Sequence, residues 1–203
     1  FSNKSFIDIG LKKNLIKSSK VLKDFFKIKA VIFDRDGTLN KNLRYVEKID
    51  RFKWLEGSIE TIKLLNYFNI KVVVATNQSG IGRNYYSMKD FKELNKKIQI
   101  KLNKNDAHID KIYCAPYYKY SKFKKYRKDY NMRKPNNGMI LKAMKKYNLN
   151  KNNCFMIGDK TLDKIAAKKS GIKFYFKEKK SLYTQIKKNL IDFCKVWFKK
   201  NEN

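Results

Sequence analysis

The sequence predicts an α/β fold in which a parallel β-sheet is covered by helices on both faces. Short apolar runs without polar alternation, such as "AVIF" at 30–33 and "KVVVATN" at 71–77, are typical of strands that are buried on both faces. Segments with apolar residues at helical spacing separate these runs, which is the pattern of parallel strands joined by helical crossovers. Ligands of such sheets bind at the carboxyl ends of the strands, so polar residues at those ends are candidates for a site.

The expected elements alternate along the middle of the chain. Strands are expected at 30–33, 71–77, 109–115, 153–159 and 173–176. Helices are expected at 58–68, 88–102, 138–148 and 161–171. The helix at 88–102 is the clearest, because Ser87 can cap its start and apolar residues recur at every third or fourth position.

Both ends of the chain differ from this middle part. Residues 1–28 begin with Phe1 rather than Met, and they predict a short strand-like start and a basic amphipathic helix near 12–26. We expect a processed or truncated product, with a boundary near 27–29.

The tail at 177–203 has apolar residues at helical spacing with lysines between them. Such a helix can lie on a membrane or close its own domain, and we expect it to pack on the domain.

Composition narrows the class of protein. Hydrophobic residues make up 42% of the 203 residues, which indicates a globular chain. No apolar run is long enough to span a bilayer, and no signal-peptide pattern is present, so we expect no membrane partner. The three cysteines form no Cys-x-x-Cys pair, which favours free thiols in a reducing compartment, that is, the cytoplasm. A single histidine, His108, argues against a Cys/His zinc site.

The net charge of +31 leaves two interpretations open. A strongly basic chain can bind nucleic acid or an anionic membrane. The alternative is a composition bias, because Lys, Asn, Ile, Tyr and Phe are over-used along the whole length and the basic residues are mostly Lys. We favour the second interpretation, and we expect a small anionic substrate rather than nucleic acid.

Three expected strands end in polar residues that suit phosphate chemistry. Asp34, Thr76 and Asp159 stand at these ends, and Asp36 follows Asp34 by two positions. Two carboxylates this close repel each other unless a cation lies between them. Asp34 and Asp159 can both bind Mg²⁺, which prefers oxygen ligands, and Asp34 could attack phosphorus.

The other residues of these segments would assist. Asp36 could give a proton to the leaving oxygen and later take one from water. Thr76 and the amides of the turn that follows can donate hydrogen bonds to the phosphoryl group. Lys134, with Lys160 as a further candidate, can neutralise its charge.

Four motifs resemble those of the haloacid-dehalogenase-type phosphatases: "DRDGT", "VVVATNQSG", "RKP" and "MIGDK…D". The fuller strings "DRDGTLNKNLRYV", "TNQSGIGR", "RKPNNGM" and "GDKTLD" resemble the D-glycero-D-manno-heptose-1,7-bisphosphate 7-phosphatases and the related histidinol-phosphate phosphatase domains. The resemblance covers about residues 29–176. It implies a Rossmann-like three-layer fold, and the gap between the first two motifs is too short for a large cap domain.

The resemblance also implies roles for particular residues. Asp34 would be the nucleophile and Asp36 the acid and base. Mg²⁺ would be bound by Asp34, the Asp36 carbonyl and Asp159, while Thr76 and Lys134 would stabilise the phosphoryl group. The substrate contacts of the family would fall on Asn42, Leu43, Arg44, Tyr45, Asn77, Gln78, Ser79, Arg133 and Lys160.

One departure from the family pattern concerns zinc. Family members carry a loop of the form Cys-x-His … Cys-x-Cys just before "RKP", and the four corresponding places here are Ala115, Tyr117, Tyr130 and Met132. We therefore expect no zinc and aromatic packing in its place. The departure bears on the substrate, because this loop borders the pocket.

The first residues carry a second resemblance. The stretch "SFIDIGLKKNLIKSSKVLKDFF" is similar to the end of sugar-phosphate nucleotidyltransferase domains. This implies an upstream nucleotidyltransferase fused to the phosphatase, with one enzyme activating the sugar 1-phosphate that the other releases.

We therefore predict a Mg²⁺-dependent phosphatase that removes the 7-phosphate of a heptose bisphosphate, with a place in lipopolysaccharide biosynthesis. Histidinol phosphate is the alternative substrate. A polynucleotide 3′-phosphatase or nucleic-acid-binding protein is the alternative from another class, because it would use the same motifs and the positive charge.

Overall fold

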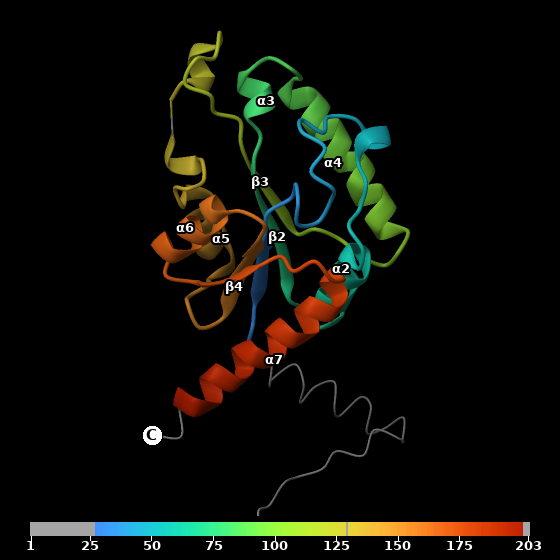
Figure 1. The fold of residues 1–203 in the computed structure, drawn as a ribbon, viewed down its shortest axis with the longest axis vertical. Helices are drawn as coiled ribbons and strands as arrows, with labels where there is room; N and C mark the ends of the chain where they lie inside the picture. Colours follow the sequence, from blue (N-terminus) through green and yellow to red (C-terminus); the bar gives the residue numbers. More distant parts are fainter. Residues whose placement is uncertain (1–26, 129, 201–203) are drawn as a thin grey trace, which may run out of the picture.

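The computed structural model describes residues 27–128 and 130–200, which form a five-stranded parallel sheet in the order β3-β2-β1-β4-β5. The strands are β1 (Ala30–Phe33), β2 (Lys71–Asn77), β3 (Lys111–Ala115), β4 (Cys154–Gly158) and β5 (Lys173–Phe176). The α-helices are α2 (Ser58–Tyr67), α3 (Ser79–Gly82), α4 (Met88–Asn103), α5 (Gly138–Tyr147), α6 (Thr161–Lys169) and α7 (Leu182–Lys200). Short 3₁₀ helices are η1 (Ile49–Arg51), η2 (Lys124–Tyr126) and η3 (Tyr130–Met132). Helices cover both faces of the sheet (Figure 1), which confirms the predicted fold class.

The central strand β1 is buried on both faces, which explains why its sequence does not alternate between polar and apolar residues. Val31 and Phe33 lie in the core that α2, α4 and α7 cover, whereas Ala30 and Ile32 lie in the core that α5 and α6 cover. All four residues are fully buried. A strand between two helical layers has no solvent face, so every position along it is apolar.

Between residues 30 and 176, each expected strand and helix is present with boundaries within two residues of the expected ones, and the difference at the start of β3 has a local cause. β3 begins at Lys111 rather than at 109, because the Asp110 carboxylate accepts the Val72 N–H at 2.9 Å in place of a backbone carbonyl. Lys71 pairs with the same carboxylate at 3.0 Å. The expected strand and helix at 1–26 lie outside the described residues.

The C-terminal helix α7 covers one face of the domain. Leu182, Ile186 and Leu190 are buried in the same core as β1, and the Phe193 ring lies 5.3 Å from the Phe155 ring between centroids. In Figure 1, α7 passes beside α2 at the amino ends of the strands. Among the described residues, no helix is both long and apolar enough to cross a bilayer.

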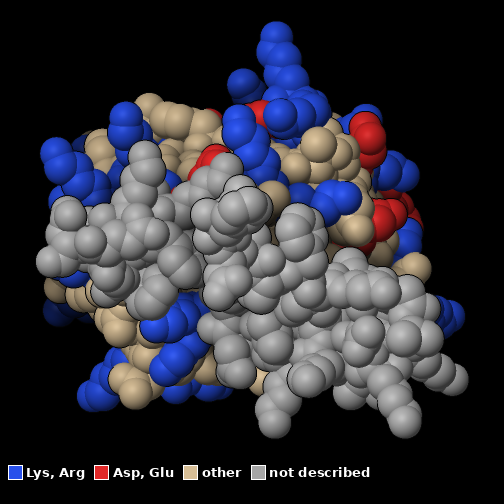
Figure 2. Space-filling view, turned by 90° about the horizontal axis from the view of Figure 1, so that it is seen from below, with Lys and Arg blue, Asp and Glu red and all other residues tan. Residues whose placement is uncertain are grey.

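The connection between β1 and β2 is short. It holds η1, α2 and the loop around them, so no large cap domain is inserted there. On the face shown in Figure 2, lysines and arginines are scattered among other residues rather than merged into one stripe.

Candidate active site

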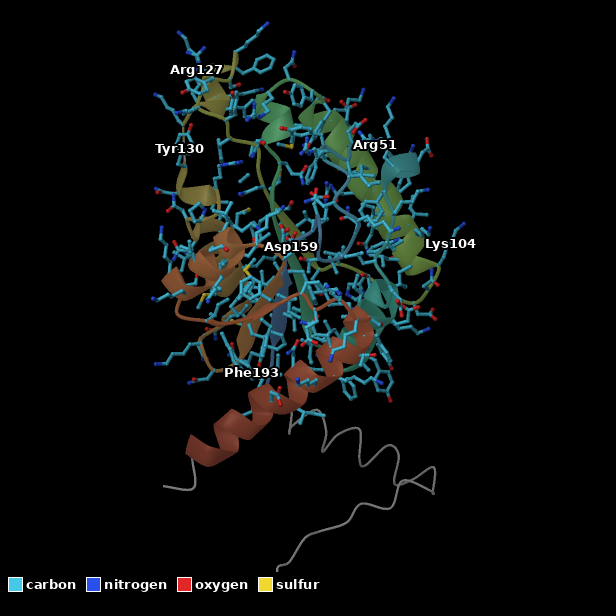
Figure 3. The ribbon with its side chains drawn as sticks, in the orientation of Figure 1. Arg51, Lys104, Arg127, Tyr130, Asp159 and Phe193 are labelled. Atoms are coloured by element: carbon cyan, nitrogen blue, oxygen red, sulfur yellow. The ribbon has the colours of Figure 1, made fainter. Side chains whose placement is uncertain are left out.

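Three neighbouring strands bring polar side chains to one rim. Asp34 follows β1, Thr76 lies near the end of β2, and Asp159 follows β4, and these strands are adjacent in the sheet. Figure 3 shows Asp159 at the centre of the molecule, between the segment that carries Arg127 and Tyr130 and the segment that carries Arg51. The rim is thus enclosed by loops from opposite sides.

A cluster of three carboxylates surrounds one lysine at this rim. Oxygens of Asp34, Asp159 and Asp163 all lie within 4.8 Å of one another. The Lys134 Nζ lies 2.6 Å from Asp34 Oδ1 and 2.5 Å from Asp163 Oδ1. Asp34, Asp163 and Lys134 are at most 4% exposed, so these charges interact with little solvent screening.

The electrostatics of the cluster follow from burial and proximity. Burial raises the pKa of Asp34 to about 6, against the opposing charge of Lys134 and with the charge of Asp163 adding to the rise. Burial also raises the pKa of Asp159. For Lys134, burial disfavours the charged form, but Asp34 and Asp163 outweigh it and raise the pKa. The cluster holds more negative than positive charge, so it has room for a further cation.

Asp36 is held by three side chains rather than by the cluster. The Arg35 guanidinium donates to both of its carboxylate oxygens at 3.0–3.2 Å. Asn40 Nδ2 donates to Oδ1 at 3.0 Å, and Gln78 Nε2 donates to Oδ2 at 2.8 Å. These donors fix the orientation of a carboxylate that stays one-fifth exposed at the rim.

Gly37 lets the loop after β1 pass close to Asp159. Its φ of 101° lies in the region that favours glycine, and a Cβ at this position would stand 2.2 Å from Asp159 Oδ2. The "DG" pair of the sequence is therefore required by the close approach of two strand ends.

The turn after β2 organises the site from within. Gln78 is 3% exposed, and its Nε2 also donates to Thr76 Oγ1 at 2.8 Å while its Oε1 accepts the Tyr86 hydroxyl at 2.5 Å. Asn77 exchanges two hydrogen bonds with the Lys134 backbone, at 2.9 and 3.0 Å. The side chains of Asn77 and Gln78, which are both expected substrate contacts, thus form hydrogen bonds within the protein. Ser79, a third expected contact, is half-buried at the start of α3.

The remaining expected contacts lie around the opening. Arg51 donates to the carbonyls of the loop at 43–45, where Arg44 and Tyr45 have positive φ values of 47° and 49°. The expected residues of this loop are exposed: Asn42, Leu43, Arg44 and Tyr45. Arg133 is half-buried and its Nη1 donates to the Tyr117 carbonyl at 3.2 Å. The exposed Lys160 has its Nζ 4.0 Å from Asp159 Oδ2.

The carboxylate cluster fits a hard cation. Asp159 Oδ1 is buried without a hydrogen-bond partner, and Asp34 offers a second carboxylate nearby. Oxygen ligands of this kind suit Mg²⁺. The third carboxylate of the cluster is that of Asp163, whereas the Asp36 side chain is bound by Arg35. Asp36 would therefore bind the cation through its backbone carbonyl, as the resemblance implies.

Two buried residues of the site are missing from the sequence-based set. Asp163 is the fourth residue after Asp159, and both of its oxygens are used: Oδ1 by Lys134, and Oδ2 by the Lys160 N–H at 3.0 Å. Arg35 is 3% exposed, and its buried guanidinium is paired with the Asp36 carboxylate at 3.0 Å. The acidic residue in the first turn after "GDK" was a usable signal for Asp163, whereas nothing in "DRD" indicated that Arg35 points inward.

Comparisons with known proteins agree with this geometry. A family model described as polynucleotide kinase 3 phosphatase matches residues 29–195. The D-glycero-beta-D-manno-heptose-1,7-bisphosphate 7-phosphatase of Pasteurella multocida is 41% identical over 145 residues, which cover 71% of this chain and 78% of the relative. The enzyme of the same name from Escherichia coli K12 is 34% identical over 140 residues, covering 69% and 73%.

A solved structure gives the same assignment. The D,D-heptose 1,7-bisphosphate phosphatase from B. bronchiseptica, complexed with magnesium and phosphate, superposes with a TM-score of 0.66 at 27% identity and covers 73% of this chain and 80% of that one. The parallel sheet, the carboxylate cluster and these similarities define a phosphoric monoester hydrolase of the haloacid-dehalogenase superfamily. Within that superfamily, the chain belongs to the family of the D-glycero-D-manno-heptose-1,7-bisphosphate 7-phosphatases.

Proposed function

We propose that this chain removes the 7-phosphate of D-glycero-D-manno-heptose 1,7-bisphosphate through an aspartyl-phosphate intermediate on Asp34. One observation supports the chemistry above all: Lys134 lies between Asp34 and Asp163, with Asp159 in the same cluster. The names of the relatives support the substrate.

The first step uses Asp34 as the nucleophile. One of its carboxylate oxygens forms a bond to phosphorus, and the bond between phosphorus and the sugar oxygen breaks. Asp36 gives a proton to that oxygen as it leaves. Lys134 and Thr76 stabilise the negative charge of the transferring group.

The second step restores the enzyme. Water attacks phosphorus, Asp36 takes a proton from the water, and the bond to Asp34 breaks to release inorganic phosphate. Asp34, Asp159 and the Asp36 carbonyl would hold Mg²⁺, which neutralises phosphate oxygens when bound. Arg35, Asn40 and Gln78 orient Asp36 through the hydrogen bonds described above.

A phosphate-release panel tests the substrate. It contains the α and β anomers of the heptose bisphosphate, because relatives carry the names of both. It also contains fructose bisphosphate and histidinol phosphate. We expect the highest kcat/KM on a heptose bisphosphate, and Asp34→Asn serves as the inactive control.

A second candidate follows from the description of the family model, polynucleotide kinase 3 phosphatase, together with the positive charge of the chain. A 3′-phosphorylated oligonucleotide in the same panel tests it. Faster release from the oligonucleotide than from any sugar phosphate, with activity falling steeply as salt rises, would replace the heptose proposal.

A further inference from the structure

Tyr86 is a buried tyrosine whose hydroxyl donates to the turn after β2. It donates to Gln78 Oε1 at 2.5 Å, and Gln78 Nε2 in turn donates to Asp36 Oδ2 and to Thr76 Oγ1, both at 2.8 Å. Tyr86 is 7% exposed and Gln78 is 3% exposed, so the bond between them is shielded from solvent. Hydrogen bonds therefore connect Tyr86 through one amide to Asp36, the proposed acid and base.

The ring of Tyr86 has a fixed place because its neighbours surround it closely. Ile81 and Phe91 form a small buried cluster with it. A Cβ on Gly80 would stand 2.3 Å from Tyr86 Cε1 and 2.9 Å from Cζ, so a side chain at position 80 would collide with the ring. Burial raises the pKa of Tyr86, so its hydroxyl stays protonated and remains a donor at neutral pH.

The orientation of the Gln78 amide decides what its neighbours can do. An amide presents N–H groups on one side and a carbonyl oxygen on the other. Because the Tyr86 hydroxyl donates to the carbonyl oxygen, the N–H groups face Asp36 and Thr76. Since Thr76 Oγ1 accepts one of these N–H groups, the hydrogen of its own hydroxyl is left to donate to a phosphoryl oxygen.

The side chains that bind the Asp36 carboxylate in the described structure are all donors. Arg35 and Asn40 donate to it, as Gln78 does. A protonated Asp36 therefore finds no acceptor among these three side chains, and its proton can pass to the leaving oxygen. If the Gln78 amide turned over, its carbonyl oxygen would face Asp36 and could accept a hydrogen bond from that proton instead.

We propose that Tyr86 is a positioning residue that fixes the Gln78 amide, so that the proton of Asp36 is kept for the leaving oxygen and that of Thr76 for the phosphoryl group. This inference rests on the proposed function, which assigns these two roles to Asp36 and Thr76. No covalent bond forms or breaks at Tyr86 itself. The effect of Tyr86 should therefore grow with the need of the leaving group for a proton.

Two aryl phosphates of similar shape test the inference. Phenolate is a poorer leaving group than p-nitrophenolate, so phenyl phosphate depends more on a proton from Asp36 than p-nitrophenyl phosphate does. The readout is the ratio of the rates at which p-nitrophenol and phenol are released in a single turnover. Asp36→Asn should raise this ratio most. Tyr86→Phe, which removes only the hydroxyl, should raise it about 10-fold.

A double-mutant cycle with Gln78→Met tests the route through the amide. Methionine keeps the length of the side chain but removes its polar groups, so Gln78→Met should raise the ratio at least as much as Tyr86→Phe does. Adding Tyr86→Phe to Gln78→Met should change the ratio no further. The matched control is Tyr147→Phe, which removes a half-buried hydroxyl that donates to the Asp110 carbonyl at 3.3 Å. It should keep the wild-type ratio.

Several outcomes would overturn the inference alone. These are an unchanged ratio in Tyr86→Phe, equal losses on both substrates, the same change in Tyr147→Phe, and a further change when Tyr86→Phe is added to Gln78→Met. Should Tyr86→Phe fail to fold, Gln78→Met decides, because an unchanged ratio there would show that the amide does not position Asp36.

The Asp36→Asn variant separates the inference from the function on which it rests. If Asp36→Asn leaves the ratio unchanged, Asp36 is not the acid, and the proposed mechanism and the inference are both wrong. If Asp36→Asn raises the ratio and Tyr86→Phe does not, only the inference is wrong. Neither substrate is a sugar, so the result does not depend on which sugar phosphate the enzyme prefers.

Discussion

The rim of the sheet and the connection between β3 and α5 hold their charged side chains in opposite ways. At the rim, Asp34, Lys134 and Asp163 are buried and paired with one another at 2.5–2.6 Å. In the connection, residues 116–133, the lysines are exposed, and Lys119 Nζ and Lys125 Nζ lie 4.5 and 5.0 Å from the centres of the Tyr120 and Tyr126 rings.

Aromatic contacts shape this connection. The Tyr118 and Tyr120 rings lie 5.6 Å apart, and the Phe123 and Tyr126 rings lie 6.0 Å apart. The Tyr118 N–H also donates to the Tyr126 carbonyl at 2.9 Å. Each ring contact contributes about 0.5–1.5 kcal/mol, so the connection is shaped by many weak contacts.

We propose that the rim carries out the chemistry and that the connection contributes to substrate recognition. Charges at the rim are buried and paired with one another, so a small displacement would leave a buried charge without its partner. The connection carries Arg133 and residues 117–118, and we expect that its weak contacts can change without disturbing Asp34, the proposed nucleophile. The residues Ala115, Tyr117, Tyr130 and Met132 do not form the zinc-ligand pattern that the resemblance leads us to expect, which agrees with this independence.

The largest effect is expected from Asp34→Asn, which removes the proposed nucleophile. Turnover should fall to background on every substrate, because an amide neither attacks phosphorus nor binds Mg²⁺ well. Asp36→Asn should also lose turnover, but an acyl phosphate should still accumulate when the leaving group departs without a proton. Steady-state assays measure the turnover of both variants, and trapping of the phosphoenzyme measures the acyl phosphate. Wild-type turnover in Asp34→Asn would refute the mechanism.

Removal of metal ions tests the rim and the connection separately. EDTA should stop activity and Mg²⁺ alone should restore it, because the rim offers oxygen ligands while the connection offers no zinc-ligand set. Phosphate release before and after adding each metal measures this. One tightly bound zinc per chain in elemental analysis would mean that the connection depends on metal after all.

Lys134→Met tests how strongly the rim depends on its buried pairing. The variant keeps an apolar stem but leaves Asp34 and Asp163 buried without a cation, so the free energy of unfolding should fall by about 3–5 kcal/mol. Urea denaturation without added Mg²⁺ measures it.

The matched control for this variant is Lys63→Met, which breaks the exposed pair with Asp106. It should leave the unfolding midpoint unchanged, because solvent screens an exposed pair. Equal effects of the two substitutions would mean that burial does not strengthen the rim.

The sequence predicts the rim better than its surroundings. Asp34, Thr76 and Asp159 were identified because strand ends of a parallel sheet must meet, which depends only on the order of elements. Arg35 was missed because the direction of a side chain in a turn depends on backbone geometry. For the same reason, the sequence did not show that the side chains of Asn77 and Gln78 also bind the Lys134 backbone and Asp36; their contact with substrate stays a prediction.

The smallest effect, and the one that bears most directly on recognition, is expected from Arg133→Ala. Arg133 and Lys134 are adjacent, yet Lys134 contacts Asp34 and Asp163 while Arg133 contacts the Tyr117 carbonyl, so the two side chains serve different parts of the site. Removing a charged hydrogen-bond donor should lower kcat/KM on the heptose bisphosphate by about 1.5–3 kcal/mol relative to p-nitrophenyl phosphate.

The control for Arg133→Ala is Lys128→Ala, which removes an exposed cation of the same connection. Lys128→Ala should leave the ratio of the two kcat/KM values unchanged if recognition depends on the position of a guanidinium rather than on the total charge of the connection. Raising the salt concentration tests the same point, because diffuse attraction is screened while a direct contact in a half-buried site is screened less. Equal losses on both substrates in Arg133→Ala would assign this arginine to the reacting phosphate, and the separation between a rim for chemistry and a connection for recognition would no longer hold.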